Sequence, residues 1–546
     1  MNPNNRIISL VVLFFAFLVK YIIFRQLVYA DVALDIAGLV GVYMELASAA
    51  ALLAACLLLT RSIVPSVLLL LLTDIWLFAN VMYYNANSVL LDWDAILFAN
   101  QLRGFEDSIL SYFAWNQATF PLITISTVAC LVVYQPVKCK QYIIPWKVLA
   151  VSMIASVILF AGSYLCRQLC QKSRLEMSQT YLLKGERRKF YKTHSPLAHF
   201  GYIIFEAIKE VFFQVQSAKP LSAKEEELLS RIYTYKDETS SRPKGHLMFV
   251  LVESFESWAL DAVDMNGIEV TENLNHFIRN HSVLLCRNIV SQQKYGRSGD
   301  GQLITQTGML PLLNGVTSMR YGHNTYPNIA HFYPNSVILD PYRNVWNQRV
   351  TTYSYGYKRL RENDIGMSTD SIILCRAREE LEQAVEPTCV LAITVNTHAP
   401  FQSVPATLLF ADTYNQTESD YLQTVHYMDM HLGRFLDWAD TASVMRNSTI
   451  VITADHNHFP VLEKKGRCPL IIKSPAITSS ITVPHAYQMD IFPTVLSAIG
   501  QNEYGWRGFG INLLDSTAVR IISVESANEL SDKLIRSNYF LQSRID

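Results

Sequence analysis

The sequence lacks a surplus of charge of either sign. Lysine and arginine together number 46 and aspartate and glutamate 47, so the 546 residues carry a formal net charge of −1. Charged residues make up only 17% of the chain, whereas 50% of it is hydrophobic. Binding of nucleic acid through bulk electrostatics needs a clear excess of basic residues. The composition therefore argues against a nucleic-acid partner.

Metal-binding cysteine patterns are also absent. The nine cysteines include no CxxC pair and no Cys/His spacing of the zinc-finger kind. Four of them stand in or beside apolar runs, where a thiol usually packs as a small hydrophobic group: Cys56, Cys130, Cys139 and Cys166. Four others follow later in the chain, and their spacing leaves any disulfide pairing open: Cys286, Cys375, Cys389 and Cys468.

What the sequence does contain is a series of long apolar runs in its first third. Each is near the roughly 20 residues that cross a hydrocarbon core, and together they cover about Ile7–Phe24, Ile36–Thr60, Ile63–Tyr83, Tyr112–Tyr134 and Ile143–Cys166. A cleaved signal peptide would explain only the first run, and a buried soluble core is improbable for five runs in succession. We therefore predict a membrane domain of five helices over residues 1–166.

Basic residues in the short loops predict the orientation of this domain. Arg6 precedes the first run, Arg61 joins the second to the third, and Lys138 and Lys140 join the fourth to the fifth. Because basic loops stay in the cytoplasm, the N-terminus should be cytoplasmic and an odd number of spans should send the rest of the chain outside. Asp74 stands within a span, and the sequence assigns it no role.

The chain becomes polar from Arg167 to about Pro243. Ser222–Tyr233 favours a helix, and Arg187–Lys189 is a basic stretch that suits either anionic head groups or a solvated face. We predict a helical connector along the outer membrane surface over residues 167–243, which ends in a linker at Ser240–Pro243.

Beyond this connector, short apolar runs alternate with helical segments. The runs resemble strands buried on both faces, at Leu247–Val252, Val283–Ile289, Val390–Val395, Thr449–Thr453 and Pro469–Ile472. Such alternation predicts an α/β domain with a mostly parallel sheet, which we place at residues 244–515, before a C-terminal tail at 516–546. Ligands of such sheets bind beyond the carboxyl ends of the strands, so the residues just after each run are the informative ones.

Chemically useful side chains follow four of these runs. Glu253 follows the first, His398 the third, and Asp455 and His456 the fourth, while Ser298 follows the second among glycines. Each one alone could be a helix cap or a turn residue. The carboxyl ends of parallel strands meet at one edge of a sheet, however, so the predicted fold brings these side chains together.

Two carboxylates, an imidazole and a hydroxyl form a four-ligand set suited to Zn²⁺ or Mn²⁺. A divalent ion lowers the pKa of a hydroxyl that it binds and polarises phosphoryl oxygens, so Ser298 could attack phosphorus without a neighbouring base. His398 could hydrogen-bond the substrate or protonate a leaving alkoxide. The set predicts a phosphotransfer site with one metal ion.

At these residues the sequence resembles the alkaline phosphatase/sulfatase superfamily and, within it, the lipoteichoic acid synthase family. The resemblance rests on Val252-Glu253-Ser254, Arg297-Ser298-Gly299-Asp300-Gly301, Asn396-Thr397-His398-Ala399-Pro400-Phe401, Ala454-Asp455-His456, Asp490-Ile491-Phe492-Pro493-Thr494-Val495 and Gly508-Phe509-Gly510. The order of membrane spans, connector and external domain also matches that family.

The resemblance implies roles for individual residues. The metal ligands would be Glu253, Ser298, Asp455 and His456, with Ser298 as the nucleophile. The substrate would contact His398, Arg297 and Asp300. The family implies one divalent ion, Mn²⁺ or Zn²⁺, with Mg²⁺ as a further option.

The resemblance also implies a function. It is the transfer of a phospho-head group, such as glycerophosphate, from a phospholipid such as phosphatidylglycerol through a serine-linked intermediate. The acceptor would be an envelope glycan or glycolipid outside a bacterial cell (inner) membrane. Two related activities fit less well. Sulfatases need Cys/Ser-x-Pro/Ala-x-Arg, whereas the chain has Ser-Gly-Asp-Gly-Gln from Ser298, and the Asp-His-Gly-Glu-Ser segment of phosphoethanolamine transferases is missing at Asp455.

The chain departs from the family pattern at three places. Ser298 replaces a threonine, which keeps the hydroxyl. Asn457-His458-Phe459-Pro460 lacks the family's tyrosine–glycine, and Val345–Arg361 offers no clear match to its tryptophan–arginine substrate pair. The departures after His456 motivate an alternative of another class, a pseudoenzyme that binds a glycan or a protein partner.

Overall fold

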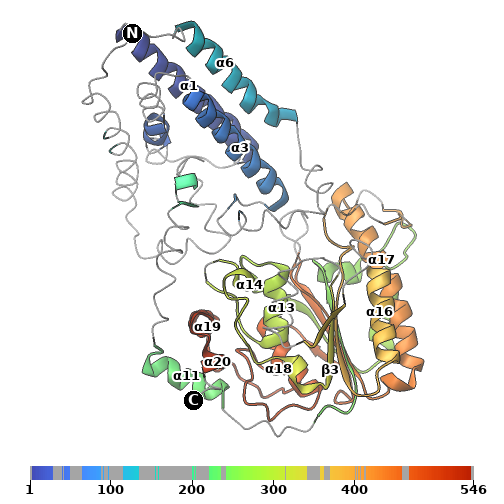
Figure 1. Cartoon of the computed structure of the whole chain (residues 1–546). Helices are drawn as coiled ribbons and strands as arrows, with labels where there is room; N and C mark the ends of the chain where they lie inside the picture. The colour runs from blue at the N-terminus through green and yellow to red at the C-terminus, as the bar shows by residue number, and fades with distance from the viewer. Residues whose placement is uncertain are drawn as a thin grey trace. The chain divides into compact units, whose positions relative to one another are not determined.

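A computed structural model describes residues 3–28, 40, 42–49, 64–87, 90–91, 96, 115–134, 154, 158, 199–201, 203–204, 220–234, 242–313, 315–340, 357–361, 369–399, 401, 404–405, 407–410, 413–457 and 466–542. The chain divides into two compact units, Met1–Val215 and Gln216–Asp546. Figure 1 shows the helices of the first unit in blue and the sheet of the second unit in green to red.

The longest helices in the described part of the first unit are α1 (Pro3–Val28), α3 (Val64–Asn87) and α6 (Thr119–Tyr134), the last preceded by the 3₁₀ turn η2 (Trp115–Ala118). They pack around a shared apolar cluster that includes Leu13, Leu70 and Leu131. Segments long and apolar enough to cross a membrane lie at Val11–Val28, Val67–Asn85 and Trp115–Val133.

These segments confirm a membrane protein and agree with the first, third and fourth predicted spans. Of the second predicted span, residues 42–49 are helical, and the fifth falls almost wholly outside the described residues. The predicted count of five spans therefore stays a prediction, as does most of the connector.

A ring of polar side chains joins the three helices. Lys20 Nζ of α1 donates to Asp74 Oδ1 of α3 at 2.5 Å and to Thr124 Oγ1 of α6 at 2.6 Å, and Thr124 Oγ1 donates to Asp74 Oδ2 at 2.5 Å. All three side chains are buried. A charge within a membrane costs much less when it is paired and hydrogen-bonded, so the ring explains how Asp74 is tolerated in a span.

The second unit is built on one sheet. Its strands are β1 (Leu247–Val252), β2 (Val283–Val290), β3 (Asn335–Leu339), β4 (Arg359–Arg361), β5 (Thr388–Ile393), β6 (Thr449–Ala454), β7 (Cys468–Lys473), β8 (Ile481–Val483) and β9 (Ala486–Tyr487). They are ordered β4-β3-β5-β1-β6-β7-β2-β8, and β9 pairs with β2. All five predicted strands are present, and β1, β5 and β6 are buried along their whole length, as expected of strands covered on both faces.

The sheet is mostly parallel, as predicted, and β7 is the strand of this sheet that runs against its neighbours β6 and β2. The segment between Ala454 and Cys468 returns the chain to an antiparallel neighbour, which a loop can do without a crossover helix.

Helices cover both faces of the sheet. In Figure 1, α16 (Asp370–Glu382) and α17 (Gln416–Thr441) lie side by side on one face, and α13 (Ser298–Thr307) and α18 (Ile491–Ala498) lie on the other. The shorter elements are α12 (Glu272–Asn280), α14 (Thr317–Arg320), η3 (Ser257–Asp261), η4 (Ile329–Phe332), η6 (Ser443–Met445) and η7 (Gln488–Asp490).

Both ends of the second unit belong to its core. The predicted connector helix is α11 (Ala223–Ile232), capped by Ser222, and it buries Leu229 and Ile232 in the same cluster as the sheet. Residues 516–546, predicted as a tail, contain α19 (Val524–Ser537) and α20 (Tyr539–Gln542). The apolar face of α19 lies in that cluster as well. The last helices are thus an integral part of the unit rather than an appendage.

The cysteines of this unit are unpaired in the described part of the chain. Cys286, Cys389 and Cys468 are buried and Cys375 is exposed, each as a free thiol. The structure therefore contains no disulfide among the four cysteines whose pairing the sequence left open.

Candidate metal and nucleophile site

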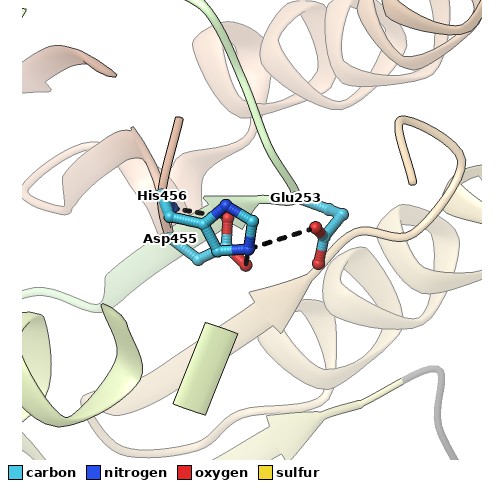
Figure 2. A group of neighbouring side chains, drawn as sticks. All are labelled: Glu253, Asp455 and His456. Carbon is cyan, nitrogen blue, oxygen red and sulfur yellow. Dashed lines mark hydrogen bonds and ion pairs between the residues drawn. The ribbon is translucent and has the colours of Figure 1, made fainter. Parts of the chain in front are cut away.

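Adjacent parallel strands bring the two predicted carboxylate ligands together. Val252, the last residue of β1, pairs with Ala454, the last residue of β6. The residues that follow, Glu253 and Asp455, therefore leave the sheet side by side at its carboxyl edge. His456 comes next, and Figure 2 shows its imidazole joined by dashed lines to both carboxylates.

The three side chains form a buried cluster. His456 Nε2 lies 3.6 Å from Glu253 Oε1 and 3.6 Å from Asp455 Oδ2. One ligand atom from each residue lies within 4.8 Å of the others, as a shared metal ion requires. The exposed fractions are 1% for Glu253, 1% for Asp455 and 6% for His456, so little solvent competes for these atoms.

Ser298 completes the predicted set. Its Oγ lies 3.2 Å from Glu253 Oε2 and 3.2 Å from His456 Nε2. Ser298 is the first residue of α13, so its side chain is placed by the start of a helix rather than by the preceding loop. The structure thus brings together all four residues that the sequence predicts as ligands.

The imidazole of His456 is oriented by the backbone. Its Nδ1 lies 3.1 Å from the carbonyl oxygen of Asn457, which can only accept a hydrogen bond. The proton therefore belongs on Nδ1, and the lone pair of Nε2 faces Ser298 and the carboxylates. A carbonyl that fixes the tautomer in this way is the usual support of a metal-binding histidine.

The residues present fit a divalent metal ion. Burial, together with the charge of Asp455, raises the pKa of Glu253, and burial raises the pKa of Asp455 to about 6. Asp455 Oδ2 is buried and accepts no hydrogen bond. Two buried carboxylates side by side are costly without a compensating charge, and a cation held by this N/O set would supply it.

Strained backbone surrounds the cluster. In the described chain, the non-glycine residues with positive φ are Ser254 (50°), Arg297 (46°), Phe401 (62°) and Asn538 (48°). Asn538 ends α19, where a left-handed residue is usual. The other three stand beside Glu253, Ser298 and the His398 segment. Such conformations cost free energy and gather at functional sites.

The glycines around Ser298 have a packing role. A Cβ added to Gly301 would lie 2.1 Å from the carbonyl oxygen of Asp455, so only glycine lets α13 approach the end of β6 this closely. A Cβ on Gly296 would lie 2.3 Å from Asp300 Oδ1. Gly301 therefore lets α13 pack against the end of β6, and Gly296 leaves room for the side chain of Asp300.

The predicted substrate-contacting residues lie around the cluster rather than in it. His398 follows β5 and is exposed, and its Nδ1 lies 2.6 Å from the carbonyl oxygen of Ala399. Asp300 is buried, and its Oδ2 accepts the backbone N–H groups of Lys294 at 2.7 Å and Gly296 at 2.9 Å, so it holds the turn before Ser298. Substrate contact stays a prediction for His398, Arg297 and Asp300.

Residues that support the cluster were not predicted from the sequence. Thr394 Oγ1 accepts the backbone N–H of Glu253 at 3.1 Å, and Thr397 Oγ1 donates to the Glu253 carbonyl. Gln488 Nε2 donates to the Asp455 carbonyl at 2.6 Å. Of these supporting residues, Thr397 could have been noticed in the sequence, because it stands beside His398. No pattern in the sequence pointed to Gln488.

Comparison with known proteins agrees with this structure in both units. Residues 248–501 match the sulfatase family model, and residues 1–217 match the model of the lipoteichoic acid synthase N-terminal domain. Lipoteichoic acid synthase 1 of Bacillus subtilis is 24% identical over 479 residues, which cover 80% of this chain and 73% of that protein. Lipoteichoic acid synthase of Staphylococcus aureus (strain USA300) is 22% identical over 482 residues, 80% of this chain and 72% of that protein.

A solved structure shares the fold of nearly the whole chain. The lipooligosaccharide phosphoethanolamine transferase EptA of Neisseria meningitidis superposes with a TM-score of 0.53 at 12% identity, over 90% of this chain and 95% of that one. This likeness concerns the fold alone. With a sulfatase domain that follows a lipoteichoic acid synthase N-terminal domain, the chain belongs to the lipoteichoic acid synthase-like family of the alkaline phosphatase/sulfatase superfamily.

Proposed function

We propose that the protein is a membrane-anchored, metal-dependent phosphotransferase of a bacterial inner membrane, with its catalytic unit on the extracytoplasmic side. The observation that supports this most strongly is the position of Ser298 Oγ, 3.2 Å from both Glu253 Oε2 and His456 Nε2. A hydroxyl at that distance from a buried carboxylate–imidazole pair supports the role of a nucleophile that would share a metal ion with them. The same proposal includes five spans, a cytoplasmic N-terminus and a catalytic domain at residues 244–515.

The donor is a phospholipid and the acceptor an envelope hydroxyl. Relatives over 80% of the chain are named lipoteichoic acid synthases, which suggests glycerophosphate from phosphatidylglycerol as the transferred group. An envelope glycan or glycolipid would accept it. Membrane helices on the same chain support a lipid donor, because they keep the catalytic unit close to the bilayer.

Glu253, Asp455, His456 and Ser298 would hold one ion, Mn²⁺ or Zn²⁺, with Mg²⁺ also possible. When bound, the ion lowers the pKa of the serine hydroxyl and stabilises charge on the phosphoryl oxygens. Ser298 would release its proton to solvent and form a bond from Oγ to phosphorus, while the bond from phosphorus to the diacylglycerol oxygen breaks. The departing oxygen would take up a proton from exposed His398, which becomes neutral.

The second half of the reaction reverses these roles. The acceptor hydroxyl passes its proton to His398 and forms a bond to phosphorus, while the bond from phosphorus to Ser298 Oγ breaks and Ser298 regains a proton from solvent. His398 in its neutral form can take the acceptor's proton, so one residue serves both halves. The chain thus needs a single nucleophile and a single exposed acid–base group.

Trapping the intermediate tests the proposal. The full chain in detergent with Mn²⁺ is incubated with phosphatidylglycerol labelled in its head group, and covalent label is expected on Ser298. Ser298→Ala should carry no label while its thermal unfolding stays close to that of the wild type. No label with phosphatidylglycerol, but label with phosphatidylethanolamine, would favour phosphoethanolamine transfer.

Metal analysis separates the enzyme from a pseudoenzyme. The purified wild type is expected to retain about one equivalent of a divalent ion, because a buried N/O cluster of this kind binds transition metals well. A protein without metal, whose melting temperature is the same with Mn²⁺, Zn²⁺ or a chelator, would instead support a non-catalytic binding protein.

A further inference from the structure

Ser254 occupies an unusual position between the two carboxylate ligands. It directly follows Glu253, is 1% exposed and has a φ of 50°. A left-handed conformation is unfavourable for a residue with a Cβ. A strained residue of this kind persists only where its surroundings hold it firmly.

Each polar group of Ser254 has a defined partner. Its Oγ donates to Glu253 Oε1 at 2.6 Å, and its backbone N–H donates to Asp455 Oδ1 at 2.8 Å. Its carbonyl accepts from the hydroxyl of Tyr421 at 3.1 Å. A single residue therefore binds one oxygen of each carboxylate.

Glu253 Oε1, which accepts from Ser254 Oγ, also lies 3.6 Å from His456 Nε2. The two carboxylate oxygens that Ser254 does not bind lie beside Ser298 and His456. Glu253 Oε2 lies 3.2 Å from Ser298 Oγ, and Asp455 Oδ2, which accepts no hydrogen bond, lies 3.6 Å from His456 Nε2. With its backbone left-handed, Ser254 directs its N–H to Asp455 and its Oγ to Glu253. The strained conformation of Ser254 thus accompanies its hydrogen bonds to both carboxylates.

We infer that Ser254 is a positioning residue that turns Glu253 and Asp455 so that each presents one oxygen to a divalent cation. This inference rests on the proposed function, because it assumes a cation at the cluster. Without the hydroxyl, the Glu253 carboxylate could rotate, and both of its oxygens would compete for the ion and for Ser298. Hydrogen bonds of this supporting kind typically change metal affinity 10- to 100-fold.

Tyr421 of α17 holds Ser254 in place. Its hydroxyl donates to the Ser254 carbonyl and accepts the backbone N–H of Glu256 at 2.8 Å. The tyrosine is completely buried. The turn after β1 is therefore fixed from the helix layer as well as from the sheet.

The test compares Ser254→Ala with Ser254→Gly in the full chain. Alanine removes the hydroxyl and keeps the strain, whereas glycine removes both. Mn²⁺ affinity is measured by titration calorimetry and by the electron paramagnetic resonance signal of the free ion, and melting temperature is measured in chelator. Both variants should bind Mn²⁺ about 10- to 100-fold more weakly, although glycine should melt at or above alanine because it tolerates positive φ.

Ser531→Ala is a matched control. Ser531 is a fully buried serine of α19 that bonds to the backbone of Leu310, and it takes no part in the cluster. Its loss should lower the melting temperature and leave Mn²⁺ affinity unchanged. A weakened affinity in Ser254→Ala therefore cannot be a general effect of removing a buried hydroxyl.

Kinetics supply an independent readout. In Ser254→Ala the Mn²⁺ concentration that gives half-maximal transfer should rise 10-fold or more, and saturating Mn²⁺ should restore most of kcat, because the ligands themselves remain. Mn²⁺ affinity within twofold of the wild type would overturn the inference and leave the proposed function intact. A wild type that binds no divalent ion would overturn both.

Discussion

His398 differs from the other predicted site residues in being exposed to solvent. It follows β5, the strand beside β1, so it stands near the cluster without belonging to it. An acid–base residue must meet both the departing lipid oxygen and the incoming acceptor. An exposed place at the edge of the buried cluster suits that task.

Replacement of His398 by alanine should therefore affect transfer and not metal binding. We expect kcat to fall about 10²- to 10⁴-fold, the usual contribution of a positioned acid–base group, while Mn²⁺ affinity stays within twofold of the wild type. His398→Gln, which keeps hydrogen bonding and loses proton transfer, should be nearly as slow. Full activity of the glutamine variant would reassign His398 to substrate binding.

Asp429 of α17 gives the second unit a pH-dependent stability. It is buried and accepts hydrogen bonds at 2.9 Å from Asn273 N, Asn273 Nδ2 and Leu274 N at the start of α12. Burial raises its pKa to about 6, although these hydrogen bonds act to lower it. The folded state therefore holds the proton more tightly than the unfolded state, whose Asp has a pKa of about 3.9.

The sign of the effect follows from this difference. The stabilisation of the folded state by protonated Asp429 is fully present below about pH 4. The free energy of unfolding then falls as the pH rises to about 6, by up to about 3 kcal/mol. Denaturant unfolding of wild type and Asp429→Asn between pH 4 and 7 should show a steeper fall in the wild type. Parallel curves for the two proteins would contradict this assignment.

At the residue scale, the sequence predicted which residues form the cluster and missed the residues that support them. Glu253, Asp455 and His456 could be predicted because a strand's end fixes where the next residue lies. The part played by Ser254 depends on a backbone angle, and that of Gln488 on a contact between residues distant in sequence. Neither leaves a local pattern.

Among the elements, α1, α3 and α6 depend on the ring of Lys20, Asp74 and Thr124. The ring is closed, since both Asp74 oxygens accept a hydrogen bond and Thr124 both donates and accepts. These hydrogen bonds tie the three helices to one another.

Replacing Lys20 alone should cost more stability than replacing both Lys20 and Asp74. Lys20→Met leaves the Asp74 carboxylate buried without its cation, and loss of one partner of such a pair costs about 3–5 kcal/mol. Lys20→Met/Asp74→Leu should be more stable than Lys20→Met alone, as judged by melting temperature in detergent. Lys473→Met, which breaks the more exposed pair with Asp440, is the control and should change little.

A double variant that melts below Lys20→Met would show that the ring stabilises the helices beyond charge compensation. Equal melting temperatures of the wild type and Lys20→Met would show that Lys20 is not paired with Asp74. Both results are distinguishable from loss of the membrane unit, because far-ultraviolet circular dichroism reports its helices.

Element length explains part of which strands were predicted, although β3, with five residues, was also missed. β1, β5 and β6 each run for six buried residues and were evident as apolar runs. β8 and β9 have three and two residues, too few for any periodicity. α19 buries one face only, so its amphipathic sequence was read as part of a tail.

At the scale of the whole molecule, the proposed ion would join β1, β6 and α13 through Glu253, Asp455 and Ser298. A ligand that binds only the folded state stabilises it by about 2.7 kcal/mol at 100 times its dissociation constant. Mn²⁺ at that excess should raise the melting temperature of the full chain, and a chelator should reverse the rise. Glu253→Gln is the control, and its melting temperature should be nearly insensitive to Mn²⁺.

The division into two units could be predicted because each unit has its own sequence pattern. Hydropathy identified a membrane unit, and alternation of apolar runs with helical segments identified an α/β unit. The close approach of α13 to β6, which depends on Gly301, belongs to neither rule. It becomes evident only when the two elements are seen in contact.

The ring of Lys20, Asp74 and Thr124 also bears on how the membrane helices meet bilayers of different thickness. Sliding one helix past another by a turn, about 5.4 Å, would break the hydrogen bonds between them. Helices held at one common depth can accommodate a thicker or thinner bilayer only by tilting together or by deforming the lipid. Changes in lipid chain length should therefore alter the inclination of α1, α3 and α6 as a group and leave their mutual register unchanged.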